Sequence, residues 1–339
     1  MKRKIKCGLK GMLANSPGFL AIAAWYTRYT PKILMMHRFC RGPQENMHAM
    51  AGPVFERQLR FLDGGKWNVI SLRQYLELRT SRRPVPPYTV ILTIDDGYRD
   101  FYAIAYPLLK KHNLPATFFV TTRFVDGDFW LWHDRIDYAL RTTRKQTFQL
   151  DFPDARRSFT MHGDEDIHQV WQALSDHCVS VPNREKWATI RRLEETLHVS
   201  PPSEVPLAYA AATWAHLREM AADGIEIGAH SVSHPILSKI SPENLANEIA
   251  GSKNAIESEL RQPVVSFCYP NGQEEDINNQ VVAHVQKAGF SGATYGCHLD
   301  FSDLYKLPRM GIGNDMVDFR WKVSGLEMLL NHHRNKAVS

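Results

Sequence analysis

The run Thr89–Ile94 (TVILTI) constrains the fold of this chain more than any other segment. It is continuous, apolar and rich in β-branched residues, which is typical of a strand buried on both faces of a parallel sheet. The sequence then predicts a helix over Tyr102–Lys111 and a second strand over Ala116–Val120. Strand, helix and strand within about 30 residues form a βαβ unit. We therefore expect a parallel sheet.

The same alternation returns in the second half of the chain. Helices are predicted over Thr213–Ala222 and Ile277–Ala288, and strands over Ile225–Ala229, Val264–Phe267 and Gly292–Tyr295. Repeated βα units are typical of an α/β fold whose parallel sheet is open or closed into a barrel.

The segment between Asp126 and Pro206 interrupts this alternation. It carries scattered tryptophans, many charges and a weak helical pattern, so we expect a mostly helical insertion between barrel units. The 339 residues are enough for one large domain or two ordinary ones. We expect a basic segment at 1–30, a barrel over 31–325 with the insertion at about 126–206, and a polar tail at 326–339.

Charge and cysteine content argue against several classes of protein. The net charge of +5 is too small to argue for nucleic acid as a partner. The five cysteines are odd in number and contain no C-x-x-C pair, which argues against a disulfide framework and a cysteine zinc site and suits a reducing compartment. The sequence has no run of about 18 apolar residues, so we expect no transmembrane helix.

The beginning of the chain is basic. Lys2, Arg3, Lys4, Lys6 and Lys10 precede every acidic residue. Such a segment is either a solvated tail or a contact for an anionic bilayer. The following apolar stretch, Gly18–Trp25, is short and lacks a clear cleavage site, so we expect it to stay uncleaved. We expect a cytoplasmic protein held peripherally at the inner membrane; the alternative is export through an atypical signal.

Two acidic residues, Asp95 and Asp96, directly follow the predicted strand Thr89–Ile94. Adjacent carboxylates raise the pKa of one of them unless a cation is present. A metal ion bound by one carboxylate, with the other free as a base, resolves the conflict. The alternative is an ordinary Asp-Gly turn.

Two histidines, His230 and His234, follow the strand Ile225–Ala229 at a spacing of four. If the backbone turns there, both rings can reach one ion at a Zn–N distance of about 2.0–2.1 Å. With Asp96 they supply two imidazoles and one carboxylate, which leaves positions open for water and substrate. Zn²⁺ is the default ion, and Ni²⁺, Co²⁺ or Mn²⁺ also fit. Asp95 would then deprotonate the attacking water.

These motifs resemble those of the polysaccharide deacetylases, the NodB-type or carbohydrate esterase family 4 group. The first and last matching segments also resemble the biofilm poly-N-acetylglucosamine deacetylase branch and bacterial glycan-cluster members. In chain order the matching segments are Ile33–Phe39 (ILMMHRF), Ile91–Val120 with its DDG, Ile225–Leu237 with HSVSHP, Ser266–Gln273 (SFCYPNGQ) and Leu307–Gly313 (LPRMGIG). The resemblance covers about residues 31–51, 89–125 and 214–325.

The resemblance implies a distorted (β/α) barrel of about seven parallel strands with one divalent ion. It implies Asp95 as the general base and Asp96, His230 and His234 as metal ligands. The reaction would be attack of water on an amide carbonyl polarised by the ion. The backbone of one turn would line the site and bind the oxyanion: Tyr269, Pro270, Asn271 and Gly272.

The chain departs from the family pattern in three places. Cys268 occupies the usual arginine position of the third motif, Asn271 replaces a tyrosine, and no Leu-x-His motif supplies a general acid. We expect His37, which follows the apolar strand Ile33–Met36, to be the acid; the alternative is a core or surface histidine. We expect Arg309 to replace the missing arginine by pairing with Asp95; the alternative is an ordinary surface arginine.

The sequence thus predicts a hydrolase that removes an N-acetyl group from an amino sugar of a glycan or lipid-linked glycan intermediate, in cell-surface polysaccharide or lipopolysaccharide biosynthesis. An O-deacetylase or deformylase with the same site and a non-catalytic carbohydrate-binding homologue are the alternatives. Phe129, Trp130 and Trp132 lie close together in the insertion. They either stack on sugars, meet a membrane interface or pack the insertion onto the barrel.

Overall fold

The computed structural model describes residues 16–42, 49–296 and 300–329. At its centre lies a parallel sheet with the strand order β12-β11-β10-β9-β6-β5-β1-β13, and β4 pairs with β5 outside this path. The strands are β1 (Lys32–Met36), β4 (Asn68–Val69), β5 (Thr89–Ile94), β6 (Thr117–Val120), β9 (Glu226–Ala229), β10 (Ser266–Cys268), β11 (Gly292–Tyr295), β12 (Leu307–Pro308) and β13 (Met310–Gly311).

The sheet curls into a nearly closed barrel through the segment 307–311. Leu307 in β12 pairs with β11, whereas Met310 in β13 pairs with Leu34 in β1. Since Arg309 alone separates β12 from β13, the two short strands together fill one strand position of the barrel wall, which we call a stave. The eight strands of the path therefore make a barrel of seven staves, which confirms the expected architecture.

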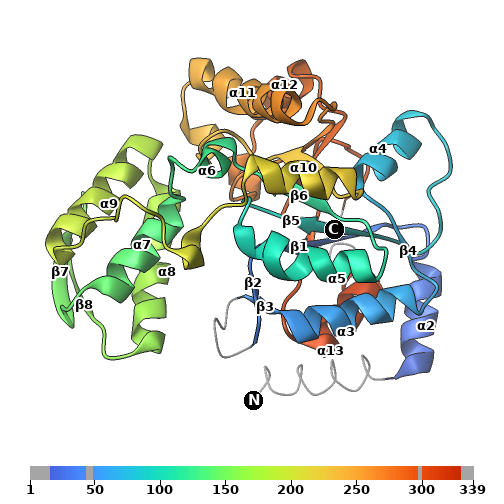
Figure 1. Ribbon diagram of the computed structural model, residues 1–339, viewed down its shortest axis with the longest axis horizontal. Helices are drawn as coiled ribbons and strands as arrows, with labels where there is room; N and C mark the ends of the chain where they lie inside the picture. The colour runs from blue at the N-terminus through green and yellow to red at the C-terminus, as the bar shows by residue number, and fades with distance from the viewer. Residues whose placement is uncertain (1–15, 43–48, 297–299, 330–339) are drawn as a thin grey trace, which may run out of the picture.

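Alternate residues of each stave face the barrel interior and the surrounding helices. Ile33, Ile91 and Phe119 belong to an interior cluster, whereas Leu92 and Phe118 belong to the cluster under the helices. This alternation is why β5 is buried along its whole length. The surrounding helices (Figure 1) are α2 (Pro17–Tyr26), α3 (Gly52–Asp63), α4 (Leu72–Thr80), α5 (Tyr106–Lys111), α6 (Thr122–Asp126), α10 (Trp214–Ala222), α11 (Pro242–Leu260), α12 (Asn279–Lys287) and α13 (Met316–Val323).

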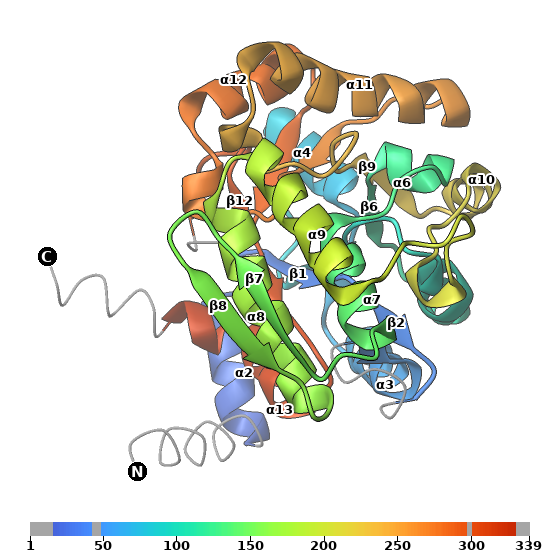
Figure 2. The same cartoon turned by 90° about the vertical axis from the view of Figure 1, so that its left-hand side faces the viewer.

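The insertion forms a layer of its own beside the barrel, facing the viewer in Figure 2. Three helices and an antiparallel hairpin surround a separate core that includes Ile136, Phe148 and Leu174. The helical part agrees with the sequence, whereas the hairpin was not predicted. The elements are α7 (Trp132–Thr142), β7 (Thr147–Asp151), β8 (Arg156–Thr160), α8 (Asp164–Ser180) and α9 (Asn183–Leu197).

Two further expectations concern cysteines and membrane spans. Cys178 and Cys268 are free thiols that are buried, as Cys40 is, and Cys7 and Cys297 lie outside the described residues. None of the helices in the described ranges combines the length and the apolar character that a membrane span requires. The basic residues Lys2–Lys10 and the tail 330–339 also lie outside the described residues.

Candidate active site

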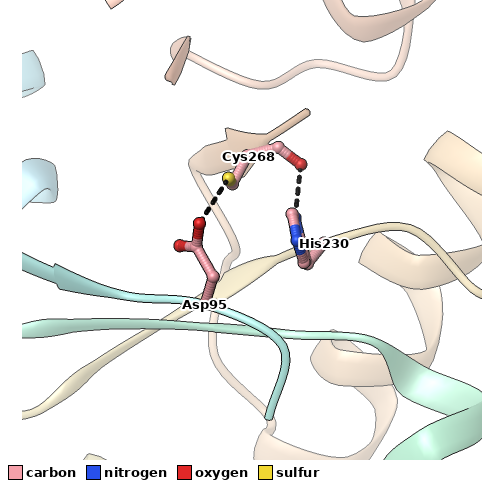
Figure 3. Close-up of side chains that lie close together, drawn as sticks. All are labelled: Asp95, His230 and Cys268. Carbon is pink, nitrogen blue, oxygen red and sulfur yellow. Dashed lines mark hydrogen bonds between the residues drawn. The ribbon is translucent and has the colours of Figure 1, made fainter. Parts of the chain in front are cut away.

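The predicted residues meet at the carboxyl ends of neighbouring staves. His37 follows β1, Asp95 and Asp96 follow β5, and His230 follows β9. Parallel α/β folds place their active-site groups at this end of the strands. Figure 3 shows Asp95, His230 and Cys268 converging there from three different strand ends.

Asp95 is buried and held by Arg309. The guanidinium donates one hydrogen bond to each carboxylate oxygen, at 2.7 and 2.6 Å. It also donates to the hydroxyl of Thr93 at 3.1 Å and to Sγ of Cys268 at 3.1 Å. Burial by itself raises the pKa of Asp95, but the charge and hydrogen bonds of Arg309 outweigh it and hold that pKa below its usual value. Asp95 is therefore an ionised, oriented carboxylate.

Asp96, His230 and His234 form a compact, buried set of candidate metal ligands. The Nε2 atoms of His230 and His234 lie 3.5 and 3.4 Å from Oδ1 of Asp96. Two ligand atoms about 2.05 Å from one ion, at the tetrahedral angle, would lie about 3.4 Å apart. These spacings are longer than good hydrogen bonds but match ligands that surround one ion, so the residues fit a divalent metal.

The environment of His230 fixes its tautomer. Its Nδ1 lies 2.8 Å from the carbonyl oxygen of Cys268 and donates to it, so Nε2 is the ring nitrogen that faces Asp96 and could bind an ion. A backbone carbonyl on the second ring nitrogen is the usual support for a metal-binding histidine. Nδ1 of His234 has no hydrogen-bond partner within the described part of the chain.

A second group, Asp95, His230 and Cys268, has equally close ligand atoms. It suits a metal less well, because Arg309 already donates to both Asp95 and Cys268. A cation between them would face the buried positive charge of the guanidinium. The Asp96 group is therefore the better candidate to hold an ion.

The backbone of the ligand loop is held in an unusual conformation. Asp96, Ser231 and His234 all have positive φ angles, of 79°, 63° and 53°. Such residues cost about 1–3 kcal/mol each and persist only where the surroundings fix them. Glu248 in α11 fixes this loop by accepting from the amides of Val232 and Ser233 at 2.9 and 2.8 Å. Sequence reasoning missed Glu248, since an acidic residue on a surface helix carries no distinctive signal.

The turn expected to bind an oxyanion offers fewer amides than its four residues suggest. The amide of Tyr269 donates to Thr294, and that of Gly272 donates to the carbonyl of Pro270. Pro270 has no amide hydrogen. Within the described residues, Asn271 is the member of this turn whose amide is left without an acceptor.

His37 lies at the mouth of the site. Its Nε2 is 3.7 Å from Oδ2 of Asp95, and its side chain is 46% exposed. This exposure rules out the alternative of a core histidine. A half-exposed imidazole beside the base can reach both substrate and solvent.

The insertion reaches the site through a buried polar network that the sequence did not reveal. Tyr98 donates to Asp134 at 2.8 Å, and its hydroxyl lies 2.8 Å from Nε2 of His133. The His133 ring in turn packs edge-on against the ring of His234, with centroids 5.9 Å apart. Burial raises the pKa of Asp134 to about 7, although Arg38 lies nearby. Helix α7 thus docks directly beside the ligand set.

A pocket of about 490 Å³ lies between the insertion and the metal-ligand loop. Phe129, Trp130 and Trp187 line it together with Ser233, which precedes the ligand His234. Trp132, in contrast, is buried in the insertion core. Phe129 and Trp130 therefore face the pocket, whereas Trp132 packs into the core of the insertion. The other lining residues are Arg123, Asp128, Arg135, Asn183 and Pro201.

Several solved structures share the fold of this chain at low sequence identity. The deacetylase PplD of Streptococcus pyogenes aligns with a TM-score of 0.56 and 18% identity over 86% of this chain and 97% of that one. IcaB from Ammonifex degensii aligns with a TM-score of 0.55 and 15% identity over 87% of this chain and 97% of that one.

The curated sequence relatives align with this chain over only part of their own length. The YxkH protein of Bacillus subtilis (strain 168) is 20% identical over 271 residues, which cover 79% of this chain and 66% of that protein. The poly-beta-1,6-N-acetyl-D-glucosamine N-deacetylase of Escherichia coli O157:H7 is 32% identical over 121 residues, 34% of this chain and 16% of that enzyme. The polysaccharide deacetylase family model matches residues 82–170 and 185–293. This chain therefore belongs to the polysaccharide deacetylase family.

Proposed function

We propose that this protein is a metal-dependent N-deacetylase that hydrolyses the N-acetyl group of an amino sugar in a glycan or lipid-linked glycan. The observation that carries the proposal is the pairing of Asp95 with Arg309 beside the set of Asp96, His230 and His234. It joins an oriented base to ligands that leave positions open for water and substrate.

The reaction needs a base, an oxyanion contact and an acid. Asp96, His230 and His234 would hold the divalent ion, which supplies Lewis-acid polarisation of the amide carbonyl and acidifies water. Asp95 takes the proton of the attacking water as the new C–O bond forms. The amide of Asn271 donates to the oxyanion. His37 gives a proton to the sugar nitrogen as the C–N bond breaks, and the products are acetate and a free amine.

The pocket beside the ligand loop supports a sugar substrate. Its aromatic rings offer flat apolar faces, and Arg123, Asp128 and Asn183 offer charged and amide groups. A few polar groups among apolar walls are typical of small-molecule sites of roughly 300–1,000 Å³. We assign this pocket to a sugar unit next to the one that loses its acetyl group.

Two other activities remain as alternatives at the same site. An O-deacetylase would cleave an ester, and a deformylase would release formate rather than acetate. A non-catalytic carbohydrate-binding homologue would follow from the absence of an arginine at position 268, but Arg309 supplies the guanidinium that this position lacks.

The test is incubation of the zinc-loaded protein with N-acetylglucosamine oligosaccharides and with lipid-linked amino sugars. We expect acetate and a product that has lost one acetyl group and gained a free amine, and we expect the Asp95→Asn variant to form both roughly 10²–10⁴-fold more slowly. Formate as the acid product would indicate the deformylase. Acetate without a new amine would indicate the O-deacetylase, and no product from any substrate would support the binding protein.

We also propose that the protein acts in the cytoplasm. Cys178 and Cys268 are free thiols, as is common in reducing compartments. Cell fractionation should recover the full-length chain on the cytoplasmic side. A shortened chain in the periplasm or medium would contradict this location.

A further inference from the structure

Most of the exposed large hydrophobic side chains of the described chain lie on α2 and the turn that follows it. Ile22, Trp25, Tyr26 and Tyr29 are between 57% and 71% exposed, and Phe19 is also exposed. We call these five residues the α2 surface. Among the described residues the one other large hydrophobic with comparable exposure is Leu207, which lies far along the chain. Clustered exposure of this kind marks an interaction site rather than chance.

Helix α2 is docked on the protein by its opposite face, so the α2 surface is held outward. Ala23 packs with Trp321 and Leu326. The hydroxyl of Thr27, just after the helix, donates to the carbonyl of Ser324 at 3.1 Å. Figure 1 shows α2 beside α13 at the edge of the molecule. The exposed residues are therefore a fixed surface and not the unpacked side of a loose end.

The composition of the α2 surface fits the boundary of a lipid bilayer. Tryptophan and tyrosine concentrate where the apolar interior meets the headgroups. The guanidinium of Arg28 lies over the rings of Trp25 and Tyr29, 4.4 and 4.7 Å from their centroids. This cation stands at the level of the rings, where lipid phosphates would be.

The positive charge of the sequence before α2 indicates that the lipids are anionic. Five basic residues and no acidic one precede α2, namely Lys2, Arg3, Lys4, Lys6 and Lys10. Basic residues near an anionic surface favour binding to it. We propose that the α2 surface, with Arg28 over its rings, binds the protein peripherally to anionic lipid bilayers.

Binding through α2 orients the site. Helix α2 leads into the first residue of β1, whereas His37 and the ligand set lie at the carboxyl ends of the strands. A stave of five or six residues spans roughly 17–20 Å, and Figure 1 shows α2 and the insertion at opposite sides of the barrel. The site thus faces away from the lipid. Resting on the proposed function, this geometry favours a glycan of several sugars over a sugar attached directly to the lipid.

Vesicle binding tests the proposal without any substrate. The full-length protein should pellet with vesicles of phosphatidylcholine and phosphatidylglycerol, less with phosphatidylcholine alone, and less at high salt. The double variant Ile22→Ser/Trp25→Ser should bind anionic vesicles at least about tenfold more weakly, because it removes two buried apolar side chains from the bound state. Leu207→Ser, an equally exposed hydrophobic elsewhere, should bind like the parent protein.

The outcomes separate the membrane from other partners. Equal thermal stability of the three proteins would show that the substitutions leave the fold intact. Unchanged binding by the double variant, or no binding of the parent protein to anionic vesicles, would overturn the proposal. So would a dimer in sedimentation velocity that the double variant dissociates while vesicle binding persists. None of these results depends on deacetylation, so a failure of the membrane proposal would leave the proposed function untouched.

Discussion

Arg309 reaches Asp95 from the break between β12 and β13, and its two hydrogen bonds end on the two carboxylate oxygens. Sγ of Cys268 lies 3.1 Å from the same guanidinium. The family pattern places an arginine at position 268, so a guanidinium from a different stave occupies the same region here. The guanidinium beside Asp95 therefore comes from position 309 and not from position 268.

This relationship predicts a rescue. Arg309→Met should lower turnover roughly 10²-fold, because an unpaired Asp95 loses its orientation. It should also destabilise the fold by about 3–5 kcal/mol, since it leaves a buried charge without a partner. The double variant Cys268→Arg/Arg309→Met should regain both activity and stability. Kinetics and thermal unfolding of the three proteins measure this, and a double variant no better than Arg309→Met would mean that an arginine at position 268 cannot take over the role of Arg309.

Replacement of Asp95 should separate chemistry from metal binding. Asp95→Asn keeps an acceptor for Arg309 and leaves the Asp96 ligand group unchanged. Since a general base contributes roughly 10²–10⁴-fold, turnover should fall by that factor at full metal content. Elemental analysis alongside the kinetics measures both. Turnover equal to the parent's would exclude Asp95 as the base.

Metal retention should depend on His234 and not on its neighbour His133. His234→Ala removes one of three protein ligands and should abolish stoichiometric metal after dialysis. His133→Ala, which removes a ring that packs against His234 without belonging to the ligand set, is the matched control and should retain the metal. A His234→Ala protein that still holds one ion would show that the ligands are assigned incorrectly.

The leaving group should reveal the role of His37. A sugar amine must be protonated as it departs, whereas the phenolate of an activated acetate ester departs without a proton. His37→Ala should therefore slow amide hydrolysis roughly 10²–10³-fold and ester hydrolysis far less. Paired rate measurements on the two substrates decide the question. Equal losses would argue against His37 as the acid.

Asp134 should make stability depend on pH. Burial raises its pKa in the folded protein to about 7, above an unfolded value of about 3.9. The folded state therefore binds more protons between these values, and the stabilisation present below about pH 4 is lost as the pH rises toward 7. The slope is at most about 1.4 kcal/mol per pH unit.

The variant Asp134→Asn keeps an acceptor for the hydroxyl of Tyr98 but does not titrate. Compared with it, the parent protein should lose free energy of unfolding between pH 4 and 7, as measured by urea denaturation. Parallel pH profiles for the two proteins would show that Asp134 has an ordinary pKa.

The sequence by itself determined the elements whose patterns are local. The run at β5, the βα alternation and the residues that follow each strand were legible because burial on both faces imposes an apolar run, and polar residues at its end stand out. These features predicted a parallel sheet, open or closed into a barrel, and placed Asp95, Asp96, His230 and His234 at the carboxyl ends of its strands; the family resemblance implied the barrel.

Only the tertiary structure decided how the barrel closes and what surrounds the ligands. β12 and β13 have two residues each, which is too short for any periodicity, and their pairing depends on staves far away in the chain. Glu248 and the Tyr98–His133–Asp134 network likewise join residues from separate elements. The outward face of α2 follows from its packing against α13. Local sequence cannot specify such contacts, because each depends on which distant surface the fold brings alongside.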